Sequence, residues 1–305
     1  MLNPTHLKTL REIASRGSIA AAADALWLTP SAVSQQMSSL EREVGQRLLE
    51  RTPRSVRLTQ AGVRLVSHAE RILADCEAAV SDLEALAEGV VGDVRVSAFP
   101  SAAQAILVPA LAALRVQHPD LAVLANDLEP HEAMPALKVG DLDVVLSHEY
   151  TTMPSYSDPG LERIDVLVEP MYAALPANHP LAGAPVLLSD LSHEHWIVGR
   201  DATFCRDCVI RAANAAGFEP HIEFETNDFR VLASAVAAGL GVALLPAIAD
   251  IHGLPGLALQ PLAGSPIKRR IFIAIRKGSR TAPLVSAVVD ALEEAATEVA
   301  TRLAQ

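Results

Sequence analysis

Two interruptions near the N-terminus divide a helical pattern into short helices, and this division constrains the fold more than any other feature. Apolar residues recur at helical spacing over 7–14, and Gly17-Ser18 then ends the pattern, with Ser18 suited to cap the alanine-rich run that follows. Thr29-Pro30 makes the second interruption, because threonine caps helices and proline is favoured at the first helical position. Three short helices in this order predict a helix-turn-helix.

The third of these helices has an uncharged polar face. Its apolar residues Val33, Met37 and Leu40 fall on one side, and serine and glutamine fall on the other. These side chains can hydrogen-bond to base edges and phosphates without the unselective attraction of a positive charge. A face that only meets solvent is the alternative. The predicted DNA contacts of this helix are Thr29, Pro30, Ser31, Ser34, Gln35 and Ser38.

Charge is distributed unevenly and supports the DNA-binding interpretation. The chain has a net charge of −11, yet residues 1–60 carry eight lysines and arginines against five acidic residues. Residues 47–59 predict a two-stranded wing with a turn near Pro53-Arg54. Guanidinium groups in such a wing suit phosphates and a narrow minor groove. The predicted wing contacts are Arg51, Arg54 and Arg57.

The residues from Gly17 to Gly62 resemble the winged helix-turn-helix of LysR-type transcriptional regulators. The resemblance is carried by the alanine-rich second helix, by "PSAVSQQ" and "LE" in the third, by "VGQRLLER" before the wing and by "LTQAG" after it. Leu49 stands where the family usually has an aromatic residue. The resemblance implies a DNA-binding domain over 1–58 and a bacterial regulator, not an enzyme. Its implied partners are double-stranded DNA and RNA polymerase.

Residues 59–89 predict a long helix that links this domain to the rest. The stretch has no proline, and its apolar residues alternate between spacings of three and four, which is an a/d seam. A lone helix with one apolar stripe must bury it, and a second copy is the simplest partner; packing on the chain's own body is the alternative. We therefore predict a homodimer or homotetramer with a pseudo-palindromic DNA target. The predicted dimer contacts are Val66, Ala69, Leu73, Cys76, Val80 and Leu83.

Residues 92–305 alternate between predicted strands and helices, which indicates parallel α/β sheets. The strands are expected near 94–99, 121–127, 143–147, 164–175, 195–198, 221–225, 242–245 and 270–276. The helices are expected near 102–117, 131–139, 206–217, 228–239 and 282–302.

The phrases "GDLDVVLS", "ALPANHPLA" and "AAGLGVALLP" extend the family resemblance over this part of the chain. They are similar to the effector domain of LysR-type regulators, which has two periplasmic-binding-protein-like lobes. The implied fold is an α/β effector domain of two such lobes, preceded by an all-α winged helix-turn-helix and a long linker helix. Lobe 1 is expected over about 92–163 and 268–305, and lobe 2 over about 164–267.

A small-molecule effector is expected between the two lobes. In open α/β sheets ligands bind beyond the carboxyl ends of the strands, where helix N-termini favour anions. Glu129 and His148 suit an amine, and Ser101 with the following amides suits a carboxylate, so an amino acid or an organic acid is predicted and no cofactor. The predicted effector contacts are Ser101, Ala102, Glu129, Ser147, His148, Thr203, Phe204 and Asn227.

Cys205 and Cys208 leave an alternative mechanism open. The resembled family has a peroxide-sensing branch with a reactive cysteine in this region, although its two cysteines lie further apart. Arg206 could stabilise a Cys205 thiolate, which would make the chain a thiol-based redox sensor. Ordinary packing is the other reading of the pair. Zinc would need two further ligands, and His193, His195 and His221 lack a regular pairing, so no metal site is predicted.

The sequence disfavours other classes of protein. We expect no secretory signal and no membrane span, since the apolar runs are broken by glycine. Three cysteines form no disulfide framework, which fits a reducing, cytoplasmic setting. A solute-binding protein or an enzyme is the remaining rival. No nucleophile elbow, HExxH sequence or phosphate loop supports it.

Overall fold

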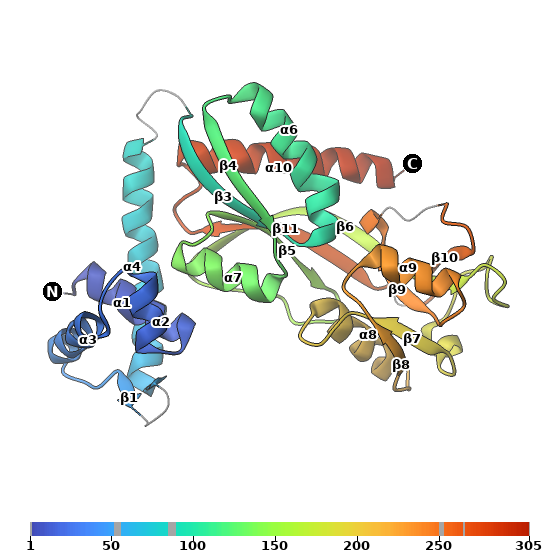
Figure 1. Cartoon of the computed structure of the whole chain (residues 1–305), viewed down its shortest axis with the longest axis horizontal. Coiled ribbons are helices and arrows are strands. Elements are labelled where there is room, and N and C mark those ends of the chain that lie inside the picture. The colour runs from blue at the N-terminus through green and yellow to red at the C-terminus, as the bar shows by residue number, and fades with distance from the viewer. Residues whose placement is uncertain (1, 52–55, 85–89, 250–252, 265, 305) are drawn as a thin grey trace.

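The computed structural model describes residues 2–51, 56–84, 90–249, 253–264 and 266–304. Figure 1 shows a small helical domain at the N-terminal end, one long helix beside it, and an α/β body that extends away from both. No helix among the described residues is both long and apolar enough to cross a membrane.

The N-terminal domain has the predicted helices and a two-stranded wing. Side-chain caps mark both predicted interruptions, because Ser18 accepts from the Ala21 N–H and Thr29 from the Ala32 N–H. The apolar faces of the helices meet in one core, to which the wing contributes. The elements are α1 (Pro4–Arg16), α2 (Ile19–Ala25), α3 (Pro30–Val44), β1 (Leu49–Arg51) and β2 (Val56–Leu58).

Helix α4 (Gln60–Glu84) stands beside the N-terminal domain and also packs on the α/β body. Ala69 is fully buried in the core of the N-terminal domain. Gly278, in the body, approaches the backbone of Ala78 so closely that an added Cβ would lie 3.1 Å from its Cα. The helix therefore joins two parts of the same chain.

This packing contradicts part of the predicted dimer seam. Ala69 belongs to the chain's own core and Val66, half-buried, packs against that core, because α1 lies along the N-terminal half of α4. Leu73 is half-buried. The N-terminal half of the α4 stripe therefore packs on the chain itself, which was the alternative. For the C-terminal half, pairing with a second copy stays a prediction. The exposed members of the seam are Cys76, Val80 and Leu83.

The body contains a mixed sheet, so the prediction of parallel sheets is wrong in this respect. Strand β3 is parallel to β4 and β5, but β11 is antiparallel to β5 and β6 because it returns from the second lobe. The strand order is β10-β6-β11-β5-β3-β4, and β9 also pairs with β6. The strands are β3 (Gly92–Ala98), β4 (Leu121–Asp127), β5 (Val144–Tyr150), β6 (Leu161–Pro176), β9 (Ala243–Pro246), β10 (Leu257–Pro261) and β11 (Lys268–Arg276).

Strand β6 connects the two lobes of the body. Its first part pairs with β11 in lobe 1, and its last residues pair with β9 and β10 in lobe 2. Strand β10 escaped prediction because it is short and only half-buried, without the alternation of a typical strand. The second lobe also holds the parallel pair β7 (His195–Val198) and β8 (His221–Glu225).

Helices cover the sheets on both sides (Figure 1). In lobe 1, α6 and α10 share one apolar core, whereas α7 packs over another. A π-helical turn precedes α6, so the helical stretch that starts after β3 is continuous. The helices are α5 (Pro100–Ala102), the π turn (Ala103–Leu107), α6 (Val108–Gln117), α7 (Pro130–Val139), α8 (Phe204–Ala215), α9 (Phe229–Ala237) and α10 (Pro283–Leu303), with 3-10 turns at Leu188–Leu191 and Ala247–Ala249.

We expect Gly278→Ala to weaken the attachment of α4 to the body. Gly278 has a φ of 89°, and an added Cβ would lie 2.6 Å from the Ala78 Cβ. Gly217→Ala is the matched control, because its φ is 90° and no atom lies within 4 Å of an added Cβ. In urea unfolding, Gly278→Ala should be less stable than the control by about 1–3 kcal/mol. Equal stabilities would contradict this close packing.

Candidate functional sites

Helix α3 presents the predicted DNA-reading face to solvent. Thr29 Oγ1 lies 2.9 Å from Ser31 Oγ, and Ser38 donates to the Ser34 carbonyl. These hydroxyls therefore already make hydrogen bonds within the helix and its cap. The Gln35 amide has no hydrogen bond to another described residue and can reach a base edge. Ser34 is half-buried, and the exposed positions are Thr29, Pro30, Ser31, Gln35 and Ser38.

The wing adds positive charge beside this face. Arg57 is exposed and lies opposite Glu50 in the antiparallel register of β1 and β2. Arg54 lies outside the described residues, and the structure does not describe the Arg51 side chain. Arg47, in the loop that precedes the wing, is exposed as well and was not among the predicted contacts.

Sequence reasoning missed Trp27. Its side chain is 94% exposed, and its φ of 55° lies in the left-handed region that residues other than glycine rarely adopt. The residue belongs to the turn between α2 and α3, so it flanks the DNA-reading helix. A large aromatic in the turn of a helix-turn-helix was the available signal.

A buried ion pair lies where the two lobes meet. Arg269, on β11, donates from Nε to the Glu169 carboxylate of β6 at 2.7 Å, and both side chains are almost wholly buried. The other Glu169 oxygen accepts from the Ile248 N–H at 2.7 Å. Arg269 also donates to Ser101 Oγ at 3.1 Å. Sequence reasoning missed this pair, although Arg269 is in phase with the buried isoleucines of its strand.

A small interlobe cavity adjoins this ion pair, and the structure brings five predicted effector contacts to it. Its volume is about 30 Å³, which holds a water molecule or two. Lobe 2 supplies polar groups that are already engaged, since Thr203 donates to the Arg200 carbonyl and Asn227 Oδ1 accepts from the Arg200 N–H. A metabolite could enter only if the lobes separate. The five contacts are Ser101, Glu129, His148, Thr203 and Asn227.

The remaining predicted effector contacts lie elsewhere. The Ala102 side chain is fully buried in the core of lobe 1, so only its backbone amide, at the start of the helical stretch, can serve the predicted contact. Ser147 and Phe204 line a different and larger cavity, which His148 also lines. His148 therefore separates the two spaces.

Burial governs protonation around the small cavity. It lowers the pKa of His148 well below the ordinary value, helped by the charge of Arg269, so the imidazole is neutral at pH 7. Burial also raises the pKa of the Glu129 carboxyl, against the charges of His131 and Arg269. The Tyr150 pKa rises for the same reason.

The two cysteines lack the surroundings of a reactive thiolate. Burial raises the pKa of Cys205 despite the nearby charge of Arg269, and raises that of Cys208 to about 12. Arg206 does not serve Cys205 as expected, because its guanidinium bonds to Asp201 and Glu225. The geometry therefore weighs against redox chemistry at this pair.

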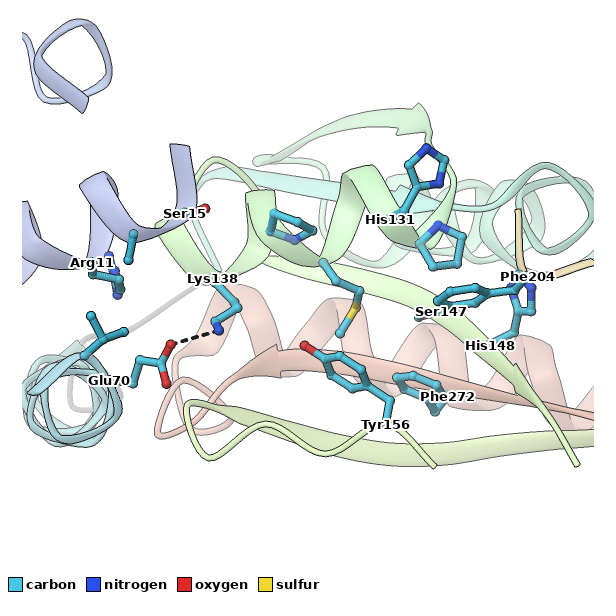
Figure 2. Close-up of a pocket in the computed structure, with 15 residues that line it drawn as sticks. Arg11, Ser15, Glu70, His131, Lys138, Ser147, His148, Tyr156, Phe204 and Phe272 are labelled. Carbon is cyan, nitrogen blue, oxygen red and sulfur yellow. Dashed lines mark ion pairs between the residues drawn. The ribbon is translucent and has the colours of Figure 1, made fainter. Parts of the chain in front are cut away.

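The larger cavity lies between the N-terminal domain and lobe 1 and has a volume of about 430 Å³ (Figure 2). Helices α1 and α4 form one wall, and α7 faces them with parts of β5 and β11. An ion pair of 2.8 Å between Lys138 Nζ and Glu70 Oε1 crosses between the walls. Nothing in the sequence indicated this space, because its two walls belong to separate predicted domains.

One exposed cluster could hold a metal ion. His195 and His221 face each other across β7 and β8, with their Nδ1 atoms 3.0 Å apart, and a carboxylate oxygen of Glu223 lies 3.4 Å from His195 Nδ1. The ligand atoms of the three residues all lie within 4.8 Å of one another. The sequence prediction had found no pairing among these histidines, because the strand register that aligns them was unknown.

Comparisons with known proteins agree with the two-part architecture. Residues 4–63 match the family described as bacterial regulatory helix-turn-helix protein, lysR family, and residues 87–297 match the LysR substrate binding domain. The probable HTH-type transcriptional regulator LrrA of Synechococcus elongatus is 31% identical over 300 residues, which is 98% of this chain and 99% of the relative. The hydrogen peroxide-inducible genes activator of Dickeya chrysanthemi is 28% identical over 296 residues, 96% and 95% of the two chains.

A solved structure of full-length CbnR in complex with its target DNA has a TM-score of 0.56 and 26% identity, covering 96% of this chain and all of that one. Fold and sites together define a transcription regulator with a DNA-binding domain and an effector-binding domain. The chain belongs to the LysR family of bacterial regulators.

We expect Glu169→Gln to destabilise the protein by about 3 kcal/mol, because it leaves the buried Arg269 cation without a counter-charge. Glu162→Gln, on the same strand and only half-buried, is the control and should cost less than about 0.5 kcal/mol. Urea unfolding measures both. If the two variants were equally stable, the Arg269–Glu169 pair would not hold the lobes together.

His148 should make stability depend on pH. Its lowered pKa means that the unfolded chain takes up a proton near pH 6.5 that the folded chain does not, so stability is lost as pH falls below that value. Between about pH 7 and 5.5, His148→Gln should lose stability less steeply than the parent chain, by up to about 1.4 kcal/mol per pH unit. Parallel curves in urea unfolding would show that the imidazole is not held neutral.

Proposed function

We propose that this regulator binds a pseudo-palindromic operator through α3 and the wing. The observation that carries this proposal is the exposed, uncharged face of α3 flanked by exposed arginines. Gln35 would read base edges, whereas Arg57, with Arg51 and Arg54 of the wing, would neutralise phosphates. The target DNA bound by the similar CbnR supports this arrangement.

Two copies would present two such surfaces. The exposed seam residues Cys76, Val80 and Leu83 of α4 support self-association, because an apolar stripe in water favours a partner. A homodimer, or a homotetramer built from it, would space two α3 helices for the two halves of the operator. RNA polymerase would be a further protein partner. The regulator would act in the cytoplasm, where the bacterial chromosome lies. The chain would act without catalysis.

A small organic acid or amino acid would control the regulator from the interlobe site. Arg269 and the start of the helical stretch after β3 provide a cation and free amides for a carboxylate, and Glu129 lies across the cavity. Because the cavity holds only a water or two, binding must shift the lobes toward a more open arrangement. In this proposal residues 1–58 bind DNA, residues 59–89 link the domains and pair with a second copy, and residues 92–305 bind the effector.

Thiol-based sensing at Cys205 and Cys208 is the second candidate. The relative of Dickeya chrysanthemi, named for hydrogen peroxide, favours it, but the raised pKa of both thiols does not. Operator binding that is indifferent to peroxide in both the parent chain and Cys205→Ser would exclude it. A peroxide response that Cys205→Ser abolishes would make it the better function.

We expect Arg57→Gln to reduce the salt dependence of operator binding by about one unit in the slope of log K against log salt, because one phosphate contact is lost. Arg302→Gln, an exposed arginine at the end of α10, is the matched control and should leave the slope unchanged. Gel shifts over a salt series with the DNA upstream of the chain's own gene measure both. An unchanged slope for Arg57→Gln would remove Arg57 from the phosphate contacts.

A further inference from the structure

The 430 Å³ cavity between the N-terminal domain and lobe 1 has the size of a small-molecule site. It is more than ten times larger than the interlobe cavity of the proposed function. Neither the DNA contacts nor the interlobe contacts use most of its lining. A ligand in this cavity would therefore be distinct from both the DNA and the interlobe effector.

The cavity has one charged end and one apolar end. Figure 2 shows Arg11, Glu70 and Lys138 together at one end, and Phe204 and His148 at the other. The long walls between them are largely apolar, with two prolines and a methionine of α7 on one side. The apolar lining consists of Ala14, Val66, Pro130, Met134, Pro135, Phe204 and Phe272.

Arg11 is the cation at the charged end that lacks a close partner. Its Nε is buried and has no hydrogen-bond partner among the described residues, and its closest described carboxylate contact is 3.8 Å, from Nη2 to Glu12. Leaving such a buried donor unpaired is unfavourable, because the group has lost its hydrogen bonds to water and has gained none in the protein. Lys138 differs, because Glu70 and Asp158 both lie 2.8 Å from its Nζ.

The charge at this end is mixed, and the buried Arg11 cation is the group that would gain from an anion beside it. Burial lowers the pKa of the Arg11 guanidinium, although the neighbouring Glu12 acts in the opposite direction, and the group stays protonated. Lys138 lies between Glu70 and Asp158 and offsets only one of these two negative charges, so Arg11 is the cation that an incoming carboxylate would meet. At the far end the neutral His148 keeps a buried Nδ1 without a partner among the described residues.

We propose that this cavity binds an amphipathic monocarboxylate, such as a medium-chain fatty acid or an arylalkanoic acid, with its carboxylate on the part of the Arg11 guanidinium that lines the cavity and its apolar body along Met134, Phe272 and Phe204. The site is additional to the interlobe effector site and does not depend on it. Its ligand would contact α1, in the domain that carries α3, and α7, in lobe 1. It would therefore favour the docked arrangement of the two domains over any other.

Binding should be coupled to DNA. If the operator requires a different placement of the N-terminal domain, ligand and operator weaken each other; if it requires this placement, they strengthen each other, by the same factor in both directions. Either sign fits the site. In both cases the coupling arises because the cavity is lined by residues of both domains.

The test uses the full-length chain and equilibrium dialysis or calorimetry with sodium decanoate, sodium 4-phenylbutyrate and the uncharged analogue 1-decanol. Decanoate, phenylbutyrate or both should bind, which also tells which apolar body the cavity prefers. Arg11→Gln should weaken carboxylate binding about tenfold or more and leave decanol unchanged, because one charge-assisted hydrogen bond is lost. Lys8→Gln, an exposed cation on the same helix, is the matched control and should bind like the parent chain.

Cavity filling gives an independent result. Met134→Trp from the α7 wall should abolish binding of all three probes, and Ala14→Phe does the same from the α1 wall if the tryptophan variant fails to fold. Absence of carboxylate binding to the parent chain, or equal binding by Arg11→Gln, overturns the proposal. Operator binding by the ligand-free parent chain tests the regulatory function separately, so the two can fail independently.

Discussion

Ion pairs across one junction fix the position of the DNA-binding domain on lobe 1, and the arrangement of the functional surfaces depends on them. Such pairs contribute little when they are fully exposed. Two of the pairs at this junction (Figure 1) are partly buried, with Glu70 10% and Arg276 14% exposed, whereas Asp141 in the third is 57% exposed. They orient the helix that reads DNA with respect to the body that binds ligands. The pairs are Arg16–Asp141 (2.7 Å), Lys138–Glu70 (2.8 Å) and Arg276–Glu77 (2.6 Å).

His148 and Arg269 connect this junction to the cleft between the lobes. Arg269 holds Glu169 on β6 and Ser101 at the start of a helix, so it ties together elements that meet where the lobes join. His148, on β5, lines both the interlobe cavity and the junction cavity, and its ring packs edge-on against Phe99 and Phe204. Any opening of the lobes must therefore disturb a wall of the junction, which gives an effector a physical route toward α3.

The sequence predicted what local chemistry determines. Capping residues such as Ser18 and Thr29 bond to backbone groups only three residues away, so they mark the start of a helix by local chemistry. The helices of the helix-turn-helix and of the body were therefore predicted close to their observed positions. The direction of the strands was not predicted correctly, because β11 returns to lobe 1 only after the whole second lobe. Ser101 and His148 could be assigned to a cleft from their positions after strands, whereas the direction of the Ala102 side chain could not be predicted without the helical phase.

Contacts between distant segments had no local signal. The burial of Ala69 by α1 and the cavity beside Arg11 both arise from how separate domains dock, and a heptad pattern alone cannot say which half of a stripe is already covered. The Arg269–Glu169 pair joins residues 100 positions apart. The only local sign of its burial was that Arg269 occupies the same face of β11 as the buried isoleucines, at every second position.

The junction is tested most directly by a double-mutant cycle on Arg276 and Glu77, with Arg276→Met, Glu77→Gln and the double variant compared in urea unfolding. The cycle cancels the bonds that Arg276 makes to other groups and isolates its contact with α4. If α4 is docked on lobe 1 as described, the coupling energy should be at least about 1 kcal/mol. A coupling near zero would mean that α4, and the DNA-binding domain with it, moves free of the effector domain.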